Sequence, residues 1–287
     1  MTEARFYKAT DDGVQCLLCP HHCRIKEGSR GLCLSRECRD GKLYALSYGM
    51  PCALAIDPVE KKPLNQFMPG TKCLSLSCTG CNLSCRWCQN SDISQVAPEQ
   101  SDRYQVSPEE MVNLCIQRSL PSIAYTYTEP FTWWEYMHDI AVLAHKKGIK
   151  NILVSAGYVE KEPLKELLPY LDAANIDIKA MDDDFYRKYC GATLTPVLEN
   201  ILAMVGAGVH VEITNLLVTG LNDSEAQIRA LCTWLADNGL QDVPLHFSRF
   251  FPRYKYTTAS PTPKEALLTA REIALSFGIK TIYLGNI

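Results

Sequence analysis

Three cysteines, Cys81, Cys85 and Cys88, stand in a C-x3-C-x2-C spacing that constrains this chain more than any other feature. Three thiolates so close together in sequence can hold a metal centre and leave one coordination position without a protein ligand. An iron–sulfur cubane normally takes four cysteines, so a [4Fe-4S] cluster on this triplet has one iron free for a small molecule. Any fold of the chain must therefore place this loop where such a molecule can reach it.

The cysteine content is high, at 14 of 287 residues. Disulfides are rare in a reducing compartment, where clustered cysteines more often bind metals or carry out redox chemistry. The N-terminus lacks the layout of a signal peptide, and no apolar stretch approaches the ~20 residues that span a bilayer. We therefore expect a soluble, cytoplasmic protein rather than a secreted, disulfide-bonded one. Cys115, Cys190 and Cys232 are predicted to be small buried core residues.

The charge pattern does not indicate a nucleic-acid or membrane partner. The net charge is −3, and no long basic run is present. A surface that binds nucleic acid is normally basic, so this class of function is not predicted.

Residues 1–70 form a cysteine-rich region with many turn residues and little sustained periodicity. Four of its cysteines form a second set: Cys16, Cys19, Cys23 and Cys33. Four thiolates fit a structural zinc ion or an auxiliary iron–sulfur cluster equally well, and the spacing does not separate the two. His21 and His22 add possible ligands without fixing a geometry. Free thiols in a lid over the rest of the protein are a third interpretation.

From Cys73 onward, short apolar or β-branched runs alternate with amphipathic stretches. The predicted strands are Cys73–Ser77, Ser122–Thr126, Asn151–Ser155, Ala174–Ile178, His210–Leu217, Pro244–Phe247 and Thr281–Leu284. The predicted helices are Pro108–Arg118, Trp133–Lys147, Lys161–Leu168, Thr195–Gly206, Ser224–Asn238 and Thr262–Phe277. This alternation implies a parallel sheet with right-handed crossovers. We predict an α/β fold with a partial or near-complete TIM-like (β/α) barrel over residues 71–287, although periodicity alone also allows a flat doubly wound sheet.

Polar side chains follow the predicted strands at the ends where barrel enzymes gather their function. They are Thr128, Glu129, Ser155, Asp177, Lys179, Glu212, Thr214, His246 and Arg249. The cysteine loop follows the first predicted strand and so belongs to the same end. A carboxylate such as that of Glu129 can receive the ammonium group of an amino acid bound at the open iron. Asp177 and Lys179 are two residues apart and therefore point to the same side of the chain.

Each of these residues also has a purely structural interpretation. Glu129 could cap a helix that begins near Thr132. Asp177 and Lys179 could form an ion pair at a strand end. His246 could be a hydrogen-bonded core histidine. The functional interpretation is favoured because all of these residues fall at one end of one predicted barrel.

Ordered motifs cover nearly the whole chain. They are Cys19-Pro20-His21-His22-Cys23, Asp57-Pro58-Val59-Glu60-Lys61-Lys62-Pro63-Leu64, Gly80-Cys81-Asn82-Leu83-Ser84-Cys85, Cys88-Gln89-Asn90, Tyr125-Thr126-Tyr127-Thr128-Glu129-Pro130, Asn175-Ile176-Asp177-Ile178-Lys179, Val211-Glu212-Ile213-Thr214, His246-Phe247-Ser248-Arg249-Phe250 and Tyr283-Leu284-Gly285-Asn286. With the aromatic Trp87 before the last cysteine of the triplet, the chain resembles the radical S-adenosylmethionine (SAM) enzymes of the AmmeMemoRadiSam system. More distantly it resembles the activating enzymes of pyruvate formate-lyase. Ser155-Ala156-Gly157 departs from the Thr-Asn-Gly of these relatives.

The resemblance implies a [4Fe-4S] cluster and SAM as cofactors. The cluster would reductively cleave SAM to methionine and a 5′-deoxyadenosyl radical, which would abstract hydrogen from an unidentified substrate. The resemblance implies cluster ligation by the cysteine triplet, with Trp87 packed beside the cluster. Thr128 and Glu129 would hold the methionyl ammonium. Contacts to the ribose, carboxylate or adenosine of SAM are implied for Ser155, Asp177, Lys179 and His246. Glu212 and Arg249 are also predicted to contact the cofactor.

Partners and alternative functions follow from the same resemblance. A flavodoxin or ferredoxin would supply electrons, and Memo-type and AMMECR-type proteins are possible functional associates. One alternative is an activase that places a radical on a glycine of a partner enzyme. Another, from a different class, is an iron–sulfur redox-sensing or binding module that never cleaves SAM.

Overall fold

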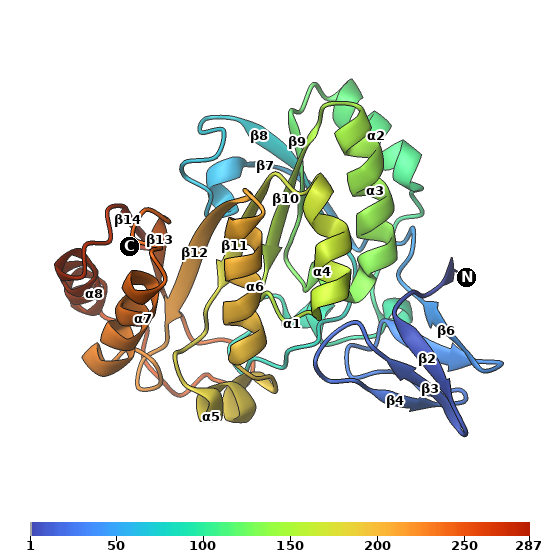
Figure 1. Ribbon diagram of the computed structural model, residues 1–287, viewed down its shortest axis with the longest axis horizontal. Coiled ribbons are helices and arrows are strands. Elements are labelled where there is room, and N and C mark those ends of the chain that lie inside the picture. Colours follow the sequence, from blue (N-terminus) through green and yellow to red (C-terminus); the bar gives the residue numbers. More distant parts are fainter. Residues whose placement is uncertain (1) are drawn as a thin grey trace.

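The computed structural model describes residues 2–287 and contains one large sheet and two small ones. The strand order of the large sheet is β14-β13-β12-β11-β10-β9-β8-β7. Strands β8 to β14 are parallel and follow one another in chain order, whereas β7 pairs antiparallel with β8. Within residues 2–287, β7 and β14 are the two edges of this sheet, so the barrel is open. The predicted TIM-like fold is confirmed as a partial barrel (Figure 1).

The element bounds are as follows. The large sheet contains β7 (Ala53–Pro58), β8 (Lys72–Ser77), β9 (Ser122–Tyr125), β10 (Lys150–Ser155), β11 (Ala173–Asp177), β12 (His210–Leu217), β13 (Leu245–Arg249) and β14 (Ile282–Gly285). The α-helices are α1 (Ser91–Ser94), α2 (Pro108–Gln117), α3 (Trp134–Lys146), α4 (Lys161–Leu167), α5 (Asp183–Phe185), α6 (Thr195–Gly206), α7 (Glu225–Asp237) and α8 (Lys264–Ser276). The small sheets contain β1 (Thr2–Glu3), β2 (Tyr7–Thr10), β3 (Gly13–Cys16), β4 (Arg24–Lys26), β5 (Arg36–Arg39) and β6 (Lys42–Ala45).

The long helices connect successive parallel strands and cover one face of the sheet, as Figure 1 shows for α3, α4 and α6. Local signals place their ends. The Ser107 hydroxyl accepts a hydrogen bond from the Glu110 N–H at 3.2 Å, and the Glu110 carboxylate accepts one from the Ser107 N–H at 2.7 Å. This reciprocal pair is a capping box, which starts α2. Gly148 has φ of 72° just after α3, a left-handed conformation that glycine adopts without strain.

Each of the seven strands and six helices predicted from Cys73 onward is present, with ends that differ by one or two residues. Most side chains of the parallel strands are buried; they include apolar residues such as Leu74 and Ile213 and also polar ones such as Asn175. One buried polar cluster holds neighbouring strands together. The Tyr125 hydroxyl donates to Asn151 Oδ1 at 2.8 Å, and the Asn151 amide donates to the carbonyls of Ala141 and Tyr170.

Residues before β8 contain more regular structure than the sequence indicated. Strands β2, β3 and β4 form one antiparallel sheet, and β1, β6 and β5 form another. These strands have two to four residues each, too short for a period-2 pattern to stand out. Strand β7 hydrogen-bonds to β8 although it lies within residues 1–70. The division of the chain at residue 70 stays a prediction. No helix within residues 2–287 is long and apolar enough to cross a membrane.

Candidate active site

The cysteine triplet lies in the loop between β8 and α1, at the carboxyl ends of the parallel strands. All three cysteines line one cavity with an empty volume of about 1160 Å³, its open mouth included. The Cys81 sulfur accepts a hydrogen bond from the Leu83 N–H at 3.3 Å, and the Cys88 sulfur lies 3.3 Å from the Ser94 hydroxyl. Trp87 also lines the cavity, and its ring packs 5.6 Å from that of Phe185.

The donor set of this cavity fits a cluster bound by three thiolates. No three metal-binding side chains within residues 2–287 are close enough to surround a single ion. A cubane holds its thiolates further apart than one ion does, because each binds a different iron. Cys190 is fully buried, as predicted, and a hydrogen bond from its thiol lowers the pKa of Cys85 below the usual thiol value. Cys190 does not line the cavity, which leaves three thiols on its wall.

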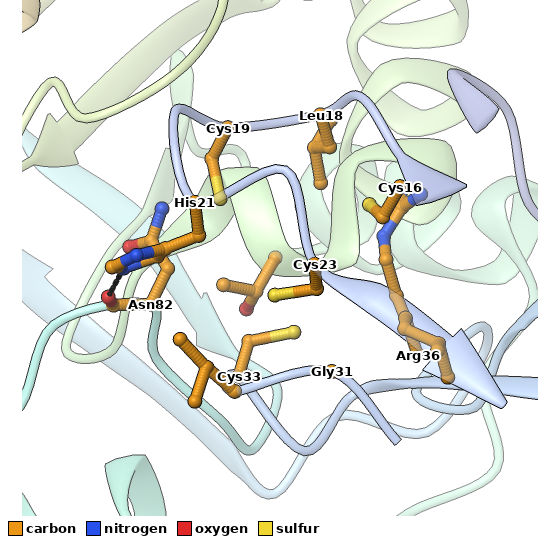
Figure 2. A pocket seen from close by; sticks show the side chains of 12 residues that line it. Cys16, Leu18, Cys19, His21, Cys23, Gly31, Cys33, Arg36 and Asn82 are labelled. Atoms are coloured by element: carbon orange, nitrogen blue, oxygen red, sulfur yellow. Dashed lines mark hydrogen bonds between the residues drawn. The ribbon is translucent and has the colours of Figure 1, made fainter. Parts of the chain in front are cut away.

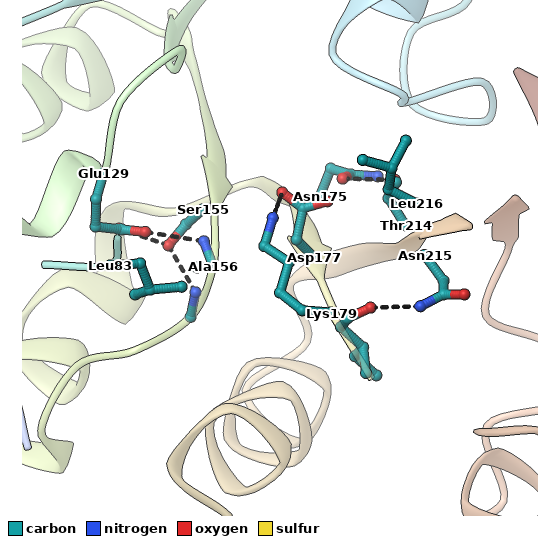
Figure 3. Close-up of polar contacts among 12 residues, drawn as sticks. Leu83, Glu129, Ser155, Ala156, Asn175, Asp177, Lys179, Thr214, Asn215 and Leu216 are labelled. Atoms are coloured by element: carbon teal, nitrogen blue, oxygen red, sulfur yellow. Dashed lines mark hydrogen bonds and ion pairs between the residues drawn. The ribbon is translucent and has the colours of Figure 1, made fainter. Parts of the chain in front are cut away.

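Glu129 presents a buried carboxylate to the same cavity. It is 1% exposed, and accepts hydrogen bonds from the Ser155 hydroxyl at 2.7 Å and the Ala156 N–H at 2.9 Å (Figure 3). Burial raises the pKa of Glu129 to about 7, although these hydrogen bonds oppose the shift. The carboxylate also accepts the Phe131 N–H at 3.3 Å, so the capping role considered from the sequence is present beside the cavity-lining one.

Asp177 and Lys179 lie across the cavity from Glu129 (Figure 3). Lys179 Nζ is 2.9 Å from Asp177 Oδ2, so the predicted ion pair is present and faces the cavity. Burial alone would lower the pKa of Lys179, but the charges of Asp177 and the Cys85 thiolate raise it above its ordinary value. A fixed positive charge therefore lies beside the cysteine triplet.

The turn after β9 is tied to the end of the cysteine loop. Asn90 donates from its side-chain amide to the Tyr127 carbonyl at 2.7 Å. Tyr127 has φ of 68°, an uncommon left-handed conformation that turns the chain so that Thr128 and Glu129 both line the cavity. The Thr128 hydroxyl donates to the Cys78 carbonyl at 2.7 Å. The Tyr127 hydroxyl bonds to Asp57, which is also paired with Lys61 and the buried Lys62.

Three predicted cofactor contacts lie outside the cavity lining: Glu212, His246 and Arg249. Glu212 is fully buried and accepts from His246 Nε2 at 2.6 Å and His210 Nε2 at 3.0 Å. It also accepts the backbone N–H groups of Asn65 and Gln66. Glu212 and His246 thus fasten the segment before β8 to the barrel, which is the structural role considered for His246. The Arg249 Nε donates to the Thr262 carbonyl at 2.6 Å.

We expect Glu212→Gln to lower the free energy of unfolding by about 3 kcal/mol, because a buried carboxylate that accepts hydrogen bonds from two histidines and two backbone N–H groups is lost. Burial alone would raise the pKa of Glu212, but its hydrogen bonds lower it to about 2. A lowered carboxyl pKa stabilises the fold above pH ~4.5, and this contribution is lost as the pH falls through ~2. Urea unfolding at pH 7 measures the change, with the exposed Glu109→Gln as control. A change below about 0.5 kcal/mol would contradict this role.

The second cysteine set also converges. Cys16, Cys19, Cys23 and Cys33 line a separate cavity of about 360 Å³, shown in Figure 2. No metal ligation follows from this observation alone.

Sequence reasoning missed several residues of the main cavity. They are Lys61, Leu83, Gln89, Asn90, Ser94, Thr126, Tyr127, Val154, Ala156, Leu216, Ser248 and Asn286. Asn90 and Tyr127 belong to the motifs Cys88-Gln89-Asn90 and Tyr125-Thr126-Tyr127-Thr128-Glu129-Pro130, and this membership could have indicated that they belong to the site. Ser248 and Asn286 lie at the ends of the last two strands, where barrel geometry could have placed them.

Residues 76–235 match the model of the radical SAM superfamily. An uncharacterized protein of Methanocaldococcus jannaschii is 48% identical over 288 residues, which cover 100% of this chain and 86% of that protein. The pyruvate formate-lyase-activating enzyme of Clostridium pasteurianum is 28% identical over 158 residues, covering 53% of this chain and 64% of that enzyme.

Solved structures agree with the fold. SuiB of Streptococcus suis bound to S-adenosylmethionine superposes with a TM-score of 0.58 at 13% identity, covering 75% of this chain and 52% of SuiB. A radical SAM methyltransferase from Sphaerobacter thermophilus gives 0.58 at 19% identity, covering 77% of this chain and 68% of that chain. The barrel, the cysteine triplet and the family match together define an enzyme of the radical SAM type. This chain belongs to the radical SAM superfamily.

Proposed function

We propose that this chain is a [4Fe-4S]-dependent radical SAM enzyme whose cluster is held by Cys81, Cys85 and Cys88. One observation carries the proposal. The three thiols, the Glu129 carboxylate and the Asp177–Lys179 pair all line a single cavity at the carboxyl ends of the strands. When bound, the cluster and SAM supply a one-electron reductive cleavage to methionine and a 5′-deoxyadenosyl radical, which removes a hydrogen atom from a substrate.

The residues of the chain bind and orient the two cofactors. Glu129 receives the methionyl ammonium of SAM, since its carboxylate is buried and already fixed by Ser155 and Ala156. On the opposite wall, Asp177 and Lys179 offer a hydrogen-bond acceptor and a cation to the ribose hydroxyls and the carboxylate. The cation of Lys179 also offsets the negative charge of the cysteine thiolates.

We further propose that this radical SAM enzyme belongs to the AmmeMemoRadiSam system, on the basis of the ordered motifs in its sequence. This assignment brings with it functional association with Memo-type and AMMECR-type proteins. Each SAM cleavage consumes one electron, which an electron donor such as a flavodoxin or ferredoxin supplies.

A second candidate is an activase that places a radical on a glycine of a partner enzyme. The similarity to a pyruvate formate-lyase-activating enzyme favours it. Such an activity needs access for a peptide loop. Lys61, from the segment before β8, lines the same cavity, so this segment forms part of the wall that such a loop would have to pass. For this reason the general radical SAM function is preferred.

The proposal is tested anaerobically on the full chain. Iron and sulfide are reconstituted, SAM and dithionite are added, and 5′-deoxyadenosine is quantified by mass spectrometry. We expect 5′-deoxyadenosine in amounts that depend on both SAM and dithionite. A fully loaded, reducible cluster that neither binds SAM nor forms this product would instead favour the redox-sensing module.

A further inference from the structure

The cysteine-rich region gathers four thiols that the proposed chemistry does not use. Cys16, Cys19, Cys23 and Cys33 come from two separate segments and face one cavity (Figure 2). Leu18, Ile25 and Leu32 supply apolar walls to the same cavity. The thiols of Cys16, Cys23 and Cys33 are close enough to interact electrostatically with one another, and Cys19 interacts with Cys16 and Cys33.

The backbone holds the first three cysteines in a tight loop between β3 and β4. The Cys16 N–H donates to the Cys23 carbonyl at 3.0 Å, which closes the base of the loop. The His22 N–H donates to the Cys19 carbonyl at 3.1 Å, and His22 has φ of 45°. A left-handed conformation at a residue other than glycine is uncommon, so the loop is held in a costly shape. That shape brings Cys16, Cys19 and Cys23 to one cavity.

Cys33 reaches the cavity from the segment between β4 and β5. The Gly31 N–H donates to the Arg36 carbonyl at 3.0 Å, and the Leu34 N–H donates to the Gly31 carbonyl at 2.9 Å. Gly31 lines the cavity, and a Cβ added there would lie 3.8 Å from the Cys23 sulfur. The absence of a side chain at this position leaves the space between the two cysteine segments open.

A buried arginine supplies an independent sign that something is bound there. The Arg36 side chain is 1% exposed and lines the cavity. Its terminal nitrogens bond to the Glu135 carboxylate at 2.7 Å and the Arg5 carbonyl at 2.9 Å, but its Nε donor has no partner. A buried donor without a hydrogen-bond partner destabilises a fold. A metal-bound thiolate is a suitable acceptor, and such hydrogen bonds to ligand sulfurs are usual around metal centres.

The second cavity shares a wall with the active site. Asn82 lines it, whereas the adjacent Cys81 lines the main cavity. His21 Nε2 lies 2.7 Å from the Asn82 carbonyl oxygen. Gly80 has φ of 95°, and a Cβ added there would lie 2.4 Å from the Cys33 carbonyl oxygen. The segment that carries Cys33 is therefore packed directly against the loop that holds Cys81, Cys85 and Cys88.

We propose that Cys16, Cys19, Cys23 and Cys33 ligate a second metal centre through four thiolates. The occupant is a zinc ion or an iron–sulfur cluster, the two groups that bind four thiolates. No three donor side chains within residues 2–287 are close enough to surround a single ion. Binding of zinc therefore requires the cysteine side chains to rotate toward one another, whereas an iron–sulfur cluster accepts thiolates that are further apart. A disulfide framework does not account for the set, because all four cysteines are free. This proposal is independent of SAM cleavage.

Metal counting on a chain without the first centre tests the proposal. The variant Cys81→Ala/Cys85→Ala/Cys88→Ala is isolated anaerobically, reconstituted with ferrous iron and sulfide or with zinc, and analysed by mass spectrometry for metals. We expect about four irons with matching sulfide, or about one zinc, per chain. Adding Cys16→Ala and Cys33→Ala should reduce that content at least tenfold.

A matched control adds Cys115→Ala and Cys232→Ala, two buried cysteines of helices α2 and α7, and should leave the metal content unchanged. Circular dichroism checks that each variant is folded. The proposal is overturned if the folded triple variant holds no metal, or if the metal persists without Cys16 and Cys33.

Wild-type protein provides a measurement that does not depend on the folding of any variant. After reconstitution in the presence of iron, sulfide and zinc, two centres predict either about eight irons, or about four irons and one zinc, per chain. About four irons with no zinc would mean that the second set remains free thiols, and would overturn the proposal. Each of these results is obtained whether or not SAM is cleaved, so the two proposals fail separately.

Discussion

Cys85→Ala is expected to abolish both cluster assembly and formation of 5′-deoxyadenosine, with more than a 100-fold loss of product. The variant keeps only two of the three cluster thiolates. Substitutions of residues that merely contact the ligands of a metal site already lower metal affinity or activity about 10–100-fold, so loss of a ligand should cost more. Iron and sulfide counts on the variant, together with the product assay, measure the two losses on one sample. The expected result is that they occur together.

Cys190 determines how this experiment is designed. Its thiol hydrogen-bonds to Cys85, so Cys190 is close enough to replace the missing ligand. The double variant Cys85→Ala/Cys190→Ala also removes this possible replacement ligand. The matched control is Cys232→Ala, which changes a buried cysteine in α7. Product formation by the double variant at the wild-type rate would refute the cluster assignment.

The barrel could be predicted because short apolar or β-branched runs alternate regularly with amphipathic helices along the chain. Runs such as Asn151–Ser155 and His210–Leu217 carry a local pattern that survives in the structure as β10 and β12. The antiparallel β7 could not be predicted in the same way. Because β7 is an edge strand, Ile56 is exposed, and the segment is a strand because it pairs with β8. Pairing partners are a property of the tertiary structure and leave little trace in a six-residue segment.

The site could be predicted only where strand ends determine it. Glu129, Ser155, Asp177 and Lys179 line the cavity because each follows a parallel strand. Glu212 follows the same rule of alternation but lies near the beginning of β12, so its side chain meets His210 and His246 below the cavity. Position along the strand decides which layer of the barrel a side chain enters. The bounds of β12 were predicted correctly, but its beginning lies below the layer that lines the cavity.

Glu129→Gln is expected to weaken SAM binding by about 10–100-fold, the cost of losing a hydrogen bond to a charged group. Glutamine keeps the size of the side chain and an acceptor for the Ser155 hydroxyl, but it presents no negative charge to the SAM ammonium. Equilibrium dialysis of labelled SAM against cluster-loaded protein measures the change. The exposed Glu109→Gln serves as the charge-matched control and should bind SAM like wild type.

The pH dependence of SAM binding separates lost charge from lost packing at Glu129. Burial raises the carboxyl pKa to about 7 in the SAM-free cavity, so below that pH the site holds a proton that the ammonium must displace. Wild-type affinity should therefore rise as the pH increases from about 5.5 to 7, a range in which the α-amino group of SAM keeps its proton. The variant, which has no ionisable group at this position, should show a flat profile over that range. If the variant retained the wild-type slope, another group would be the ammonium ligand, and Glu129 would serve only to cap the turn that begins at Pro130.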